Sequence, residues 1–324
     1  MRAVVCRRPG SPGGLGLEEV DQPAVEDDGV LVRVHASSAN PVDLYALSRM
    51  AHLQRRRKPM VVGTDFAGTV EATGRSVTAF APGDEVFGAA RGSFAEYVSV
   101  AASAGVVRKP AGVSFEDAAT LAVAASTALQ SLRDHGRVES GQRVLVNGAS
   151  GGVGTFAVQI AKSFGAEVTA VCSAGNVDLV RALGADTVID YTKEDFTRSG
   201  KHYDLMLDVA GSHTWSECAR VLDRGATYVG VGAAAVQHGK GGPRRALAHF
   251  LGIRLASTGS GRRVVVLFLA KLRKDDLELL GGLVESGRVK PSIEKRYDLA
   301  GVPEALAHIE SGHLRGKLAI RIDR

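Results

Sequence analysis

Hydrophobic and polar positions follow two different patterns along the 324-residue chain. Up to about residue 120, short apolar runs alternate with turns rich in glycine and proline, which is typical of antiparallel strands. One helical pattern, at residues 43–53, interrupts them, so a mostly antiparallel β domain is predicted. The predicted strands cover residues 2–6, 30–35, 68–71, 84–87, 94–100 and 106–108.

Strands and helices alternate between about residues 124 and 267, after a helical stretch that Ser114 opens and residues 118–133 continue. This alternation is typical of a parallel, doubly wound sheet. The predicted helices cover residues 155–164, 177–183 and 214–222. The predicted strands cover residues 143–146, 167–172, 187–189, 205–209, 226–231 and 263–267.

The tail is predicted to contain helices near residues 275–286 and 303–311 and a last strand at residues 318–322. We expect this tail to rejoin the first domain. The predicted fold class is therefore α/β. It combines a β-rich domain, made of residues 1–123 and 268–324, with a parallel-sheet domain at residues 124–267.

The turn at residues 147–154 carries the clearest candidate chemistry. It lies between the predicted strand at residues 143–146 and a helix, and it has almost no side chains. This geometry directs backbone N–H groups and a helix N-terminus at a pyrophosphate. Its fingerprint is Ala149-x-Gly151-x-x-Gly154, with alanine in place of the first glycine. In this context the fingerprint predicts a dinucleotide site.

The composition, with 45% hydrophobic and 23% charged residues, is that of an ordinary globular protein. A net charge of +5 suits an anionic cofactor, but the scattered Lys and Arg give no nucleic-acid footprint. The three cysteines lie far apart, which argues against a disulfide framework or structural zinc. No signal peptide or membrane-length apolar run is recognisable. We therefore expect a cytoplasmic protein with neither nucleic acid nor membrane as a partner.

The residues beyond the glycine turn bear on the choice of nicotinamide cofactor. An NAD enzyme usually presents an acid about 20 residues past the motif, but residues 171–176 contain neither Asp nor Glu. Ser173, Asn176 and Tyr191 could instead donate hydrogen bonds to a 2′-phosphate. NADPH is therefore favoured, with NADH as the alternative. Ser173 and Asn176 can also cap the following helix.

Six motifs, taken together, resemble the medium-chain dehydrogenase/reductase superfamily and most closely its zinc-free quinone oxidoreductase branch. They lie in the family's order over nearly the whole chain, at residues 38–43, 63–70, 82–88, 147–154, 183–191 and 311–317. The resemblance implies a GroES-like catalytic domain formed by both ends of the chain and a central Rossmann domain, with the active cleft between them.

Zinc-dependent members of this superfamily place Cys where this chain has Asn40, and a His-Glu pair where it has Thr64 and Asp65. They also carry a four-Cys lobe, and no cysteine occurs here between Gly88 and Val100. The nine histidines never pair at ligand spacing with a Cys or another His, so no zinc site is predicted. Without a Lewis acid, the function shifts from alcohol oxidation to reduction of an electrophilic acceptor.

The resemblance places Asn40, Asp43 and Tyr45 near the nicotinamide and the substrate. Asn40 would donate a hydrogen bond to the acceptor oxygen, and Tyr45 is the candidate proton donor. The sequence Asn-Pro-x-Asp is also a good turn and helix cap, and Tyr45 could serve packing alone. The residues predicted to contact the cofactor are Thr127, Ala149, Ser150, Gly151, Gly152, Val153, Gly154, Ser173, Asn176, Tyr191, Gly230, Gly232, Arg315 and Lys317. Gly175, where many relatives have Arg, leaves mixed cofactor use open.

The predicted function is zinc-independent, NADPH-dependent hydride transfer to quinones. The alternatives are reduction of the C=C bond of enones or alkenals, a cofactor-binding protein with little catalysis, and, least supported, a zinc alcohol dehydrogenase.

Residues 55–58, Arg-Arg-Arg-Lys, form either a solvated basic loop or a clamp for an anionic substrate. The apolar strand at residues 264–268 would need a partner at a sheet edge. Because the superfamily often pairs this edge, a homodimer is expected.

Overall fold

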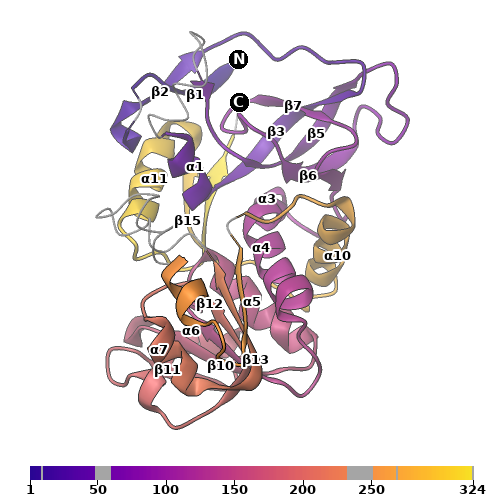
Figure 1. Cartoon of the computed structure of the whole chain (residues 1–324). Coiled ribbons are helices and arrows are strands. Elements are labelled where there is room, and N and C mark those ends of the chain that lie inside the picture. Colours follow the sequence, from indigo (N-terminus) through magenta and orange to yellow (C-terminus); the bar gives the residue numbers. More distant parts are fainter. Residues whose placement is uncertain (9, 48–59, 232–250, 268, 323–324) are drawn as a thin grey trace.

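A computed structural model of the chain describes residues 1–8, 10–47, 60–231, 251–267 and 269–322. The chain forms two lobes, one rich in antiparallel strands and holding both termini, the other built on a parallel sheet (Figure 1). The helices α3 (Phe115–Ala119) and α4 (Ser126–Gln130) lie between the lobes. Two π-helical turns, Leu121–Ala125 and Ser131–Gly136, interrupt the single helix predicted here.

The β-rich lobe contains a seven-stranded sheet in the order β15-β16-β3-β5-β6-β8, with β7 also paired to β3. β16 lies antiparallel to β3, with Leu318 opposite Ala39, so the C-terminal tail joins the N-terminal part of the chain. The strands are β3 (Gly29–Ala39), β5 (Asp65–Thr73), β6 (Glu85–Ala89), β7 (Tyr97–Ala101), β8 (Val106–Arg108), β15 (Ile293–Asp298) and β16 (Lys317–Arg321). A small second sheet pairs β1 (Arg2–Cys6) with β2 (Leu15–Glu19) and β4 (Met60–Val61).

The other lobe contains a six-stranded parallel sheet in the order β11-β10-β9-β12-β13-β14. The chain enters at β9 in the middle and then builds outward on both sides, which opens a crevice at the carboxyl ends of the central strands. The α/β fold class with a doubly wound sheet is thus confirmed. The strands are β9 (Arg143–Asn147), β10 (Glu167–Cys172), β11 (Thr187–Asp190), β12 (Tyr203–Asp208), β13 (Leu222–Val231) and β14 (Arg263–Leu267).

Helix α5 (Gly152–Ser163) follows the glycine turn, and its residues 154–161 are all buried, including Phe156, Val158 and Ile160. Burial of such side chains supplies about 1.5–3 kcal/mol each, which fixes the helix against the sheet. The other α-helices in the described residues include α1 (Pro41–Ala46), α6 (Val177–Ala182), α7 (Trp215–Cys218), α10 (Lys274–Glu285) and α11 (Val302–Glu310).

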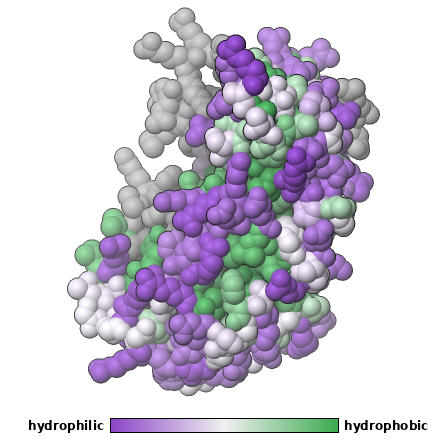
Figure 2. All heavy atoms as spheres, turned by 90° about the vertical axis from the view of Figure 1, so that its right-hand side faces the viewer, coloured by the Kyte–Doolittle hydropathy of each residue, from purple (hydrophilic) through white to green (hydrophobic). Residues whose placement is uncertain are grey.

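One hydrophobic core continues from lobe to lobe. It joins Phe87 and Val107 of the β-rich sheet to Val144 and Phe156 of the parallel-sheet lobe through the apolar residues of α3 and α4. From the side, hydrophobic side chains gather along the middle of the molecule between more polar regions (Figure 2). This packing holds the two lobes in a fixed relation, so the crevice between them has a defined shape.

Several element boundaries differ from the predictions. Helix α1 begins at Pro41 instead of residue 43, because Asn40 and Asp43 form a capping box there. Helix α7 ends at Cys218, and a 3-10 turn at Ala219–Val221 continues it to the start of β13. The strands β2, β4 and β15 were not predicted. The expected continuation of the first helix to residue 53 and the basic residues 55–58 lie outside the described residues.

Candidate functional site

A cavity of about 680 Å³ lies between the two lobes, a size typical of small-molecule sites. The β-rich lobe contributes the start of α1 and Thr64, and the parallel-sheet lobe contributes the glycine turn. The connecting helical segment contributes Val123, Ala124 and Thr127. Residues from three separate parts of the chain therefore face one common space.

The glycine turn forms one wall of this cavity, with Ser150, Gly151, Gly152 and Val153 lining it. A Cβ at Gly154 would lie 2.1 Å from the carbonyl oxygen of Gly148, so only glycine lets the helix start this close to the strand. No side chain caps α5, which leaves the N–H groups of its first turn open. This cradle fits the diphosphate of a dinucleotide.

Ala149, at the first position of the fingerprint, does not line the cavity. It is fully buried, and its N–H donates to the carbonyl oxygen of Val171 at 3.0 Å. Alanine therefore fits this position because the residue packs beneath the turn, against the neighbouring strand. The prediction that it touches the cofactor remains a prediction.

Ser173 and Asn176 lie beside the glycine turn, at the carboxyl end of β10. The amide of Asn176 donates to Ser150 Oγ at 3.2 Å and to Ser173 Oγ at 3.1 Å. Asn176 stands at the N-cap position of α6 and Ser173 at that of the 3-10 turn before it, as the alternative interpretation expects, but neither side chain makes a capping hydrogen bond. Tyr191 lines the cavity with 59% of its surface exposed. A Cβ at Gly175 would meet nothing within 4 Å, so the space beside this loop is open.

The cavity wall that follows β11 and β12 was not predicted. Here Asp195, Phe196, Ser212 and His213 face the cavity. His213 shares a hydrogen bond of 2.9 Å between Nδ1 and Ser212 Oγ, and its ring packs edge-on against Phe196 with centroids 4.6 Å apart. These residues belong to no recognised motif, and only the strand ends predicted at residues 189 and 209 hinted at their place.

A buried polar network supports the same edge of the sheet. Asp208 accepts hydrogen bonds from Asn147 Nδ2 at 2.9 Å, from the Tyr228 hydroxyl at 2.7 Å and from the Gly211 N–H at 2.8 Å. It thereby ties the loop after β12 to the glycine turn after β9. The signal in the sequence is a polar residue at the end of each apolar strand, Asn147 and Asp208.

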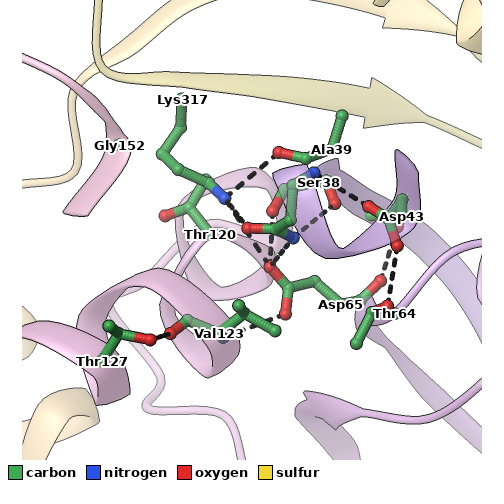
Figure 3. A network of polar contacts seen from close by, with 12 residues as sticks. Ser38, Ala39, Asp43, Thr64, Asp65, Thr120, Val123, Thr127, Gly152 and Lys317 are labelled. Carbon is green, nitrogen blue, oxygen red and sulfur yellow. Dashed lines mark hydrogen bonds and ion pairs between the residues drawn. The ribbon is translucent and has the colours of Figure 1, made fainter. Parts of the chain in front are cut away.

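The floor of the cavity contains Asn40, whose side chain is fully engaged within the protein. Figure 3 shows the surrounding polar network, in which Lys317, Asp65 and Asp43 lie close together. Its Nδ2 donates to the Ser38 carbonyl oxygen at 3.1 Å and to Asp65 Oδ2 at 2.8 Å. Its Oδ1 accepts from Lys317 Nζ at 2.5 Å. A hydrogen bond from Asn40 to a substrate oxygen would have to displace one of these acceptors. The expected role as a direct donor stays a prediction.

Lys317 is a buried cation beneath the cavity, with only 2% of its surface exposed. Besides Asn40, its Nζ contacts the Ala39 carbonyl oxygen at 3.3 Å and lies 3.8 Å from Asp65 Oδ2. Burial lowers the pKa of Lys317 and raises that of Asp65, while the opposite charge of each favours the ionised form of the other. A Cβ on Gly152 would lie 3.2 Å from Lys317 Cδ, so the lysine stem packs against the glycine turn.

Asp65 joins this floor to the helical segment between the lobes. Its Oδ2 also accepts from Ser38 Oγ at 2.7 Å, and its Oδ1 accepts from the N–H of Val123 at 3.0 Å. Thr127, one turn further on, donates to the Val123 carbonyl oxygen at 2.7 Å and lines the cavity. In the sequence, Asp65 was noted only as a position where zinc-dependent relatives carry a ligand.

Another polar group lies at the start of α1 and contains Asp43, Thr64 and Tyr45. The buried carboxyl of Asp43 accepts from the Asn40 N–H at 2.8 Å and from Thr64 Oγ1 at 2.7 Å. Burial raises the pKa of Asp43 to about 7. Thr64 and Tyr45 line the cavity, and burial also raises the pKa of Tyr45. The helix-cap interpretation of Asn40 and Asp43 is confirmed; their chemical role stays a prediction.

Two further predicted cofactor residues, Gly230 and Arg315, are not among the described residues that line the cavity. Gly230 is buried within β13, opposite Asp208 of β12. Arg315 is exposed, and its backbone N–H donates to Glu294 Oε2 at 2.8 Å. Gly232 lies outside the described residues.

Two features of the described part of the chain bear on the metal and membrane predictions. In that part, no three His, Cys, Asp or Glu side chains gather where they could hold a metal ion. The described helices include none long and apolar enough to cross a membrane.

Removal of the Lys317 charge tests the buried ion pair. We expect Lys317→Met to lower the free energy of unfolding by about 3–5 kcal/mol, because it leaves Asp65 as an uncompensated buried charge. In urea titrations, Lys317→Met combined with Asp65→Asn should lose less than the sum of the two single changes. Arg315→Met is the control, with an exposed side chain and an expected change within about 0.5 kcal/mol. Strict additivity of the two changes would contradict this account.

Two family profiles match the chain. The profile described as an alcohol dehydrogenase GroES-like domain matches residues 26–111, and the one described as a zinc-binding dehydrogenase matches residues 183–320. Among solved structures, the quinone oxidoreductase from Coxiella burnetii superimposes with a TM-score of 0.87 at 29% identity, covering 100% of this chain and 99% of that one.

Curated relatives are similar over most of the chain. The mitochondrial NAD(P)H oxidoreductase RTN4IP1 of Homo sapiens is 35% identical over 332 aligned residues, which cover 90% of this chain and 81% of the relative. The trans-enoyl reductase pgmF of Aspergillus terreus is 36% identical, with 91% of this chain and 87% of the relative covered. On this similarity the chain belongs to the medium-chain dehydrogenase/reductase superfamily, in its quinone oxidoreductase branch.

Proposed function

We propose that the protein is a zinc-independent reductase that uses NADPH to transfer a hydride to a quinone. One observation carries this proposal. The open helix N-terminus and glycine turn, which fit a dinucleotide diphosphate, share a single cavity with the hydroxyl groups of Thr64 and Tyr45. A cofactor held by the turn and an acceptor on the opposite floor would therefore face each other.

The chain's own residues would position the reactants and exclude water. When bound, NADPH supplies the hydride. Apolar side chains from both lobes, including Val42 and Leu314 of the β-rich lobe and Val209 of the parallel-sheet lobe, line the cavity and limit access of solvent. The reduced acceptor gains negative charge, and Tyr45 is a candidate donor of the neutralising proton.

The substrate class rests on the named relatives. One is called a quinone oxidoreductase, one a trans-enoyl reductase and one an NAD(P)H oxidoreductase. We therefore keep reduction of the C=C bond of enones or alkenals as the second candidate, since a hydride can reach either acceptor from the same cofactor. A protein that binds cofactor with little catalysis is the third.

We also propose the division of the chain into a GroES-like domain, residues 1–123 and 268–324, and a Rossmann domain, residues 124–267. The pairing of β16 with β3 supports it. The cytoplasmic location stays a prediction from the sequence, and one relative is named mitochondrial.

Turnover assays on the metal-stripped protein test the function. We expect NADPH oxidation with 1,4-benzoquinone and 9,10-phenanthrenequinone, unaffected by chelator. Gly154→Ala is the negative control, because its Cβ would collide with the Gly148 carbonyl oxygen and distort the diphosphate cradle. Turnover of a 2-alkenal alone would favour the enone reductase. Cofactor binding without turnover of any acceptor would favour the binding protein, and activity only with added zinc would refute zinc independence.

The cofactor preference depends on the neutral donors Ser173 and Asn176. We expect Asn176→Asp to raise the KM for NADPH relative to NADH by about tenfold or more, because a carboxylate would repel the 2′-phosphate; tenfold corresponds to about 1.4 kcal/mol. Asn176→Ala, which removes the donor without adding charge, should have a smaller effect. Steady-state kinetics with both cofactors measure the ratio. An unchanged ratio in both variants would place the 2′-phosphate elsewhere.

The homodimer is proposed on the edge of the parallel sheet. β14 is the last strand in the order of that sheet, and Leu255 and Leu269 near it in the chain are 75% and 64% exposed. Pairing two copies edge to edge would satisfy the free backbone groups of β14. Light scattering at micromolar concentration should give twice the chain mass of 33.9 kDa, and a monomeric mass would refute the proposal.

A further inference from the structure

The hydroxyl of Thr64 connects the cavity to a carboxyl group behind it. Thr64 lines the cavity and is only partly buried, whereas Asp43 is buried and does not line it. The two are joined by the hydrogen bond of 2.7 Å between Thr64 Oγ1 and Asp43 Oδ1. The other carboxyl oxygen of Asp43 accepts from the backbone N–H of Asn40. The side-chain route from this carboxyl to the cavity therefore runs through Thr64.

The surroundings of Asp43 decide its charge. Burial raises its pKa to about 7, and the hydrogen bonds from Thr64 and Asn40 lower it. Two charged groups face it from other strands: Asp65 on β5 raises the pKa and Lys317 on β16 lowers it. On its own helix, Tyr45 is the other titratable group. Asp43 therefore holds a proton below about pH 7 and loses it as the pH rises above that value.

We propose that Thr64 donates the proton that neutralises the reduced acceptor and that Asp43 replaces this proton, so that the pair acts as a relay from a buried acid to the cavity. This inference rests on the proposed reductase function. It assigns the proton donor to Thr64 in place of Tyr45, and it gives Asp43 a chemical role besides capping α1.

The relay balances in protons and electrons. The hydride carries two electrons and one hydrogen to the acceptor, which becomes an oxyanion while the cofactor is oxidised. The O–H bond of Thr64 breaks as a new O–H bond forms on the acceptor oxygen. At the same time the O–H bond of Asp43 breaks and its proton moves to Thr64 Oγ1. Thr64 ends unchanged, Asp43 ends as a carboxylate, and one proton from solvent restores it before the next turnover.

The direction of the hydrogen bond makes the relay dependent on pH. An ionised Asp43 can only accept, so it holds the Thr64 hydrogen away from the cavity. A protonated Asp43 donates to Thr64 Oγ1 and leaves the Thr64 hydrogen free to point at the acceptor. The relay is therefore active below about pH 7 and is lost as the pH rises through that value.

Carbon-13 NMR of aspartate-labelled, cofactor-free protein tests the acid directly. We expect one carboxyl signal to titrate near pH 7 and to disappear in Asp43→Asn. In Thr64→Val, which keeps the branched shape but removes the hydroxyl, the same signal should titrate at a higher pH, because the donor that lowers the pKa is gone. If the titration of this signal were identical with and without the Thr64 hydroxyl, the coupling of the pair would be refuted.

Single-turnover NADPH oxidation tests the proton transfer. Thr64→Val should slow 1,4-benzoquinone reduction by about 100-fold and abolish the fall in rate above pH 7, while Thr64→Ser restores both. The slowing caused by Thr64→Val should be smaller with tetrachloro-1,4-benzoquinone, because the hydroquinone anion of this acceptor depends less on being protonated. Tyr45→Phe is the comparison variant: whatever its effect on the rate, the fall in rate above pH 7 should remain. The dissociation constant of NADPH, followed by fluorescence, should be unchanged in the two Thr64 variants.

The outcomes separate this inference from the function on which it rests. An unaltered protein that oxidises no NADPH with any quinone or enone would refute the proposed function itself. A protein that is active and whose Thr64→Val variant keeps the rate and the pH profile would refute the relay alone. Loss of the pH dependence in Tyr45→Phe, with Thr64→Val unaffected, would assign the donor to Tyr45.

Discussion

The buried ammonium of Lys317 constrains the arrangement of the whole cleft. A charge removed from water needs hydrogen-bonding and ionic partners around it, since otherwise its desolvation would cost several kcal/mol. Here the partners are Asn40 and Ala39, 277 and 278 residues away in sequence, and Asp65. The last strand of the chain must therefore lie beside β3, and its lysine stem must lie against the glycine turn at Gly152. A single side chain thus connects both ends of the chain to the cofactor cradle.

The polar groups around this lysine each combine a structural task with a place in the site. Asp65 accepts from Val123 and thereby positions the helical segment that carries Thr127 to the cavity. Asp43 caps the helix that presents Tyr45. Because hydrogen bonds of the floor join β3, β5, α1, β16 and the helical segment between the lobes, the floor behaves as one rigid unit. Rigidity of this kind is what a hydride transfer requires, since the reacting atoms must be held close and aligned.

Local patterns explain which parts of this arrangement could be predicted from the sequence. The parallel strands and the glycine turn each carry their own signature, so the doubly wound sheet followed from residues 124–267 alone. The strand β15, IEKRYD, was missed because it lies at the edge of its sheet and exposes most of its side chains, which leaves no apolar run to recognise. The hydrogen bonds of Asn40 and Thr64 could not be predicted, because their partners depend on the tertiary fold: Asp43 lies 21 residues from Thr64.

The charges of the floor explain why a neutral Asp43 would suit the chemistry. With Asp43 protonated, the positive charge of Lys317 balances the negative charge of Asp65, and the buried cluster has no net charge. Ionisation of Asp43 would add a negative charge next to a cavity in which the acceptor itself becomes negative, and like charges at low dielectric repel strongly. The burial that raises the pKa of Asp43 therefore keeps the floor without net charge while the acceptor becomes negative. It also holds a proton on Asp43, and only the Thr64 hydroxyl separates this proton from the cavity. Capping, charge balance and proton supply all depend on this one carboxyl group.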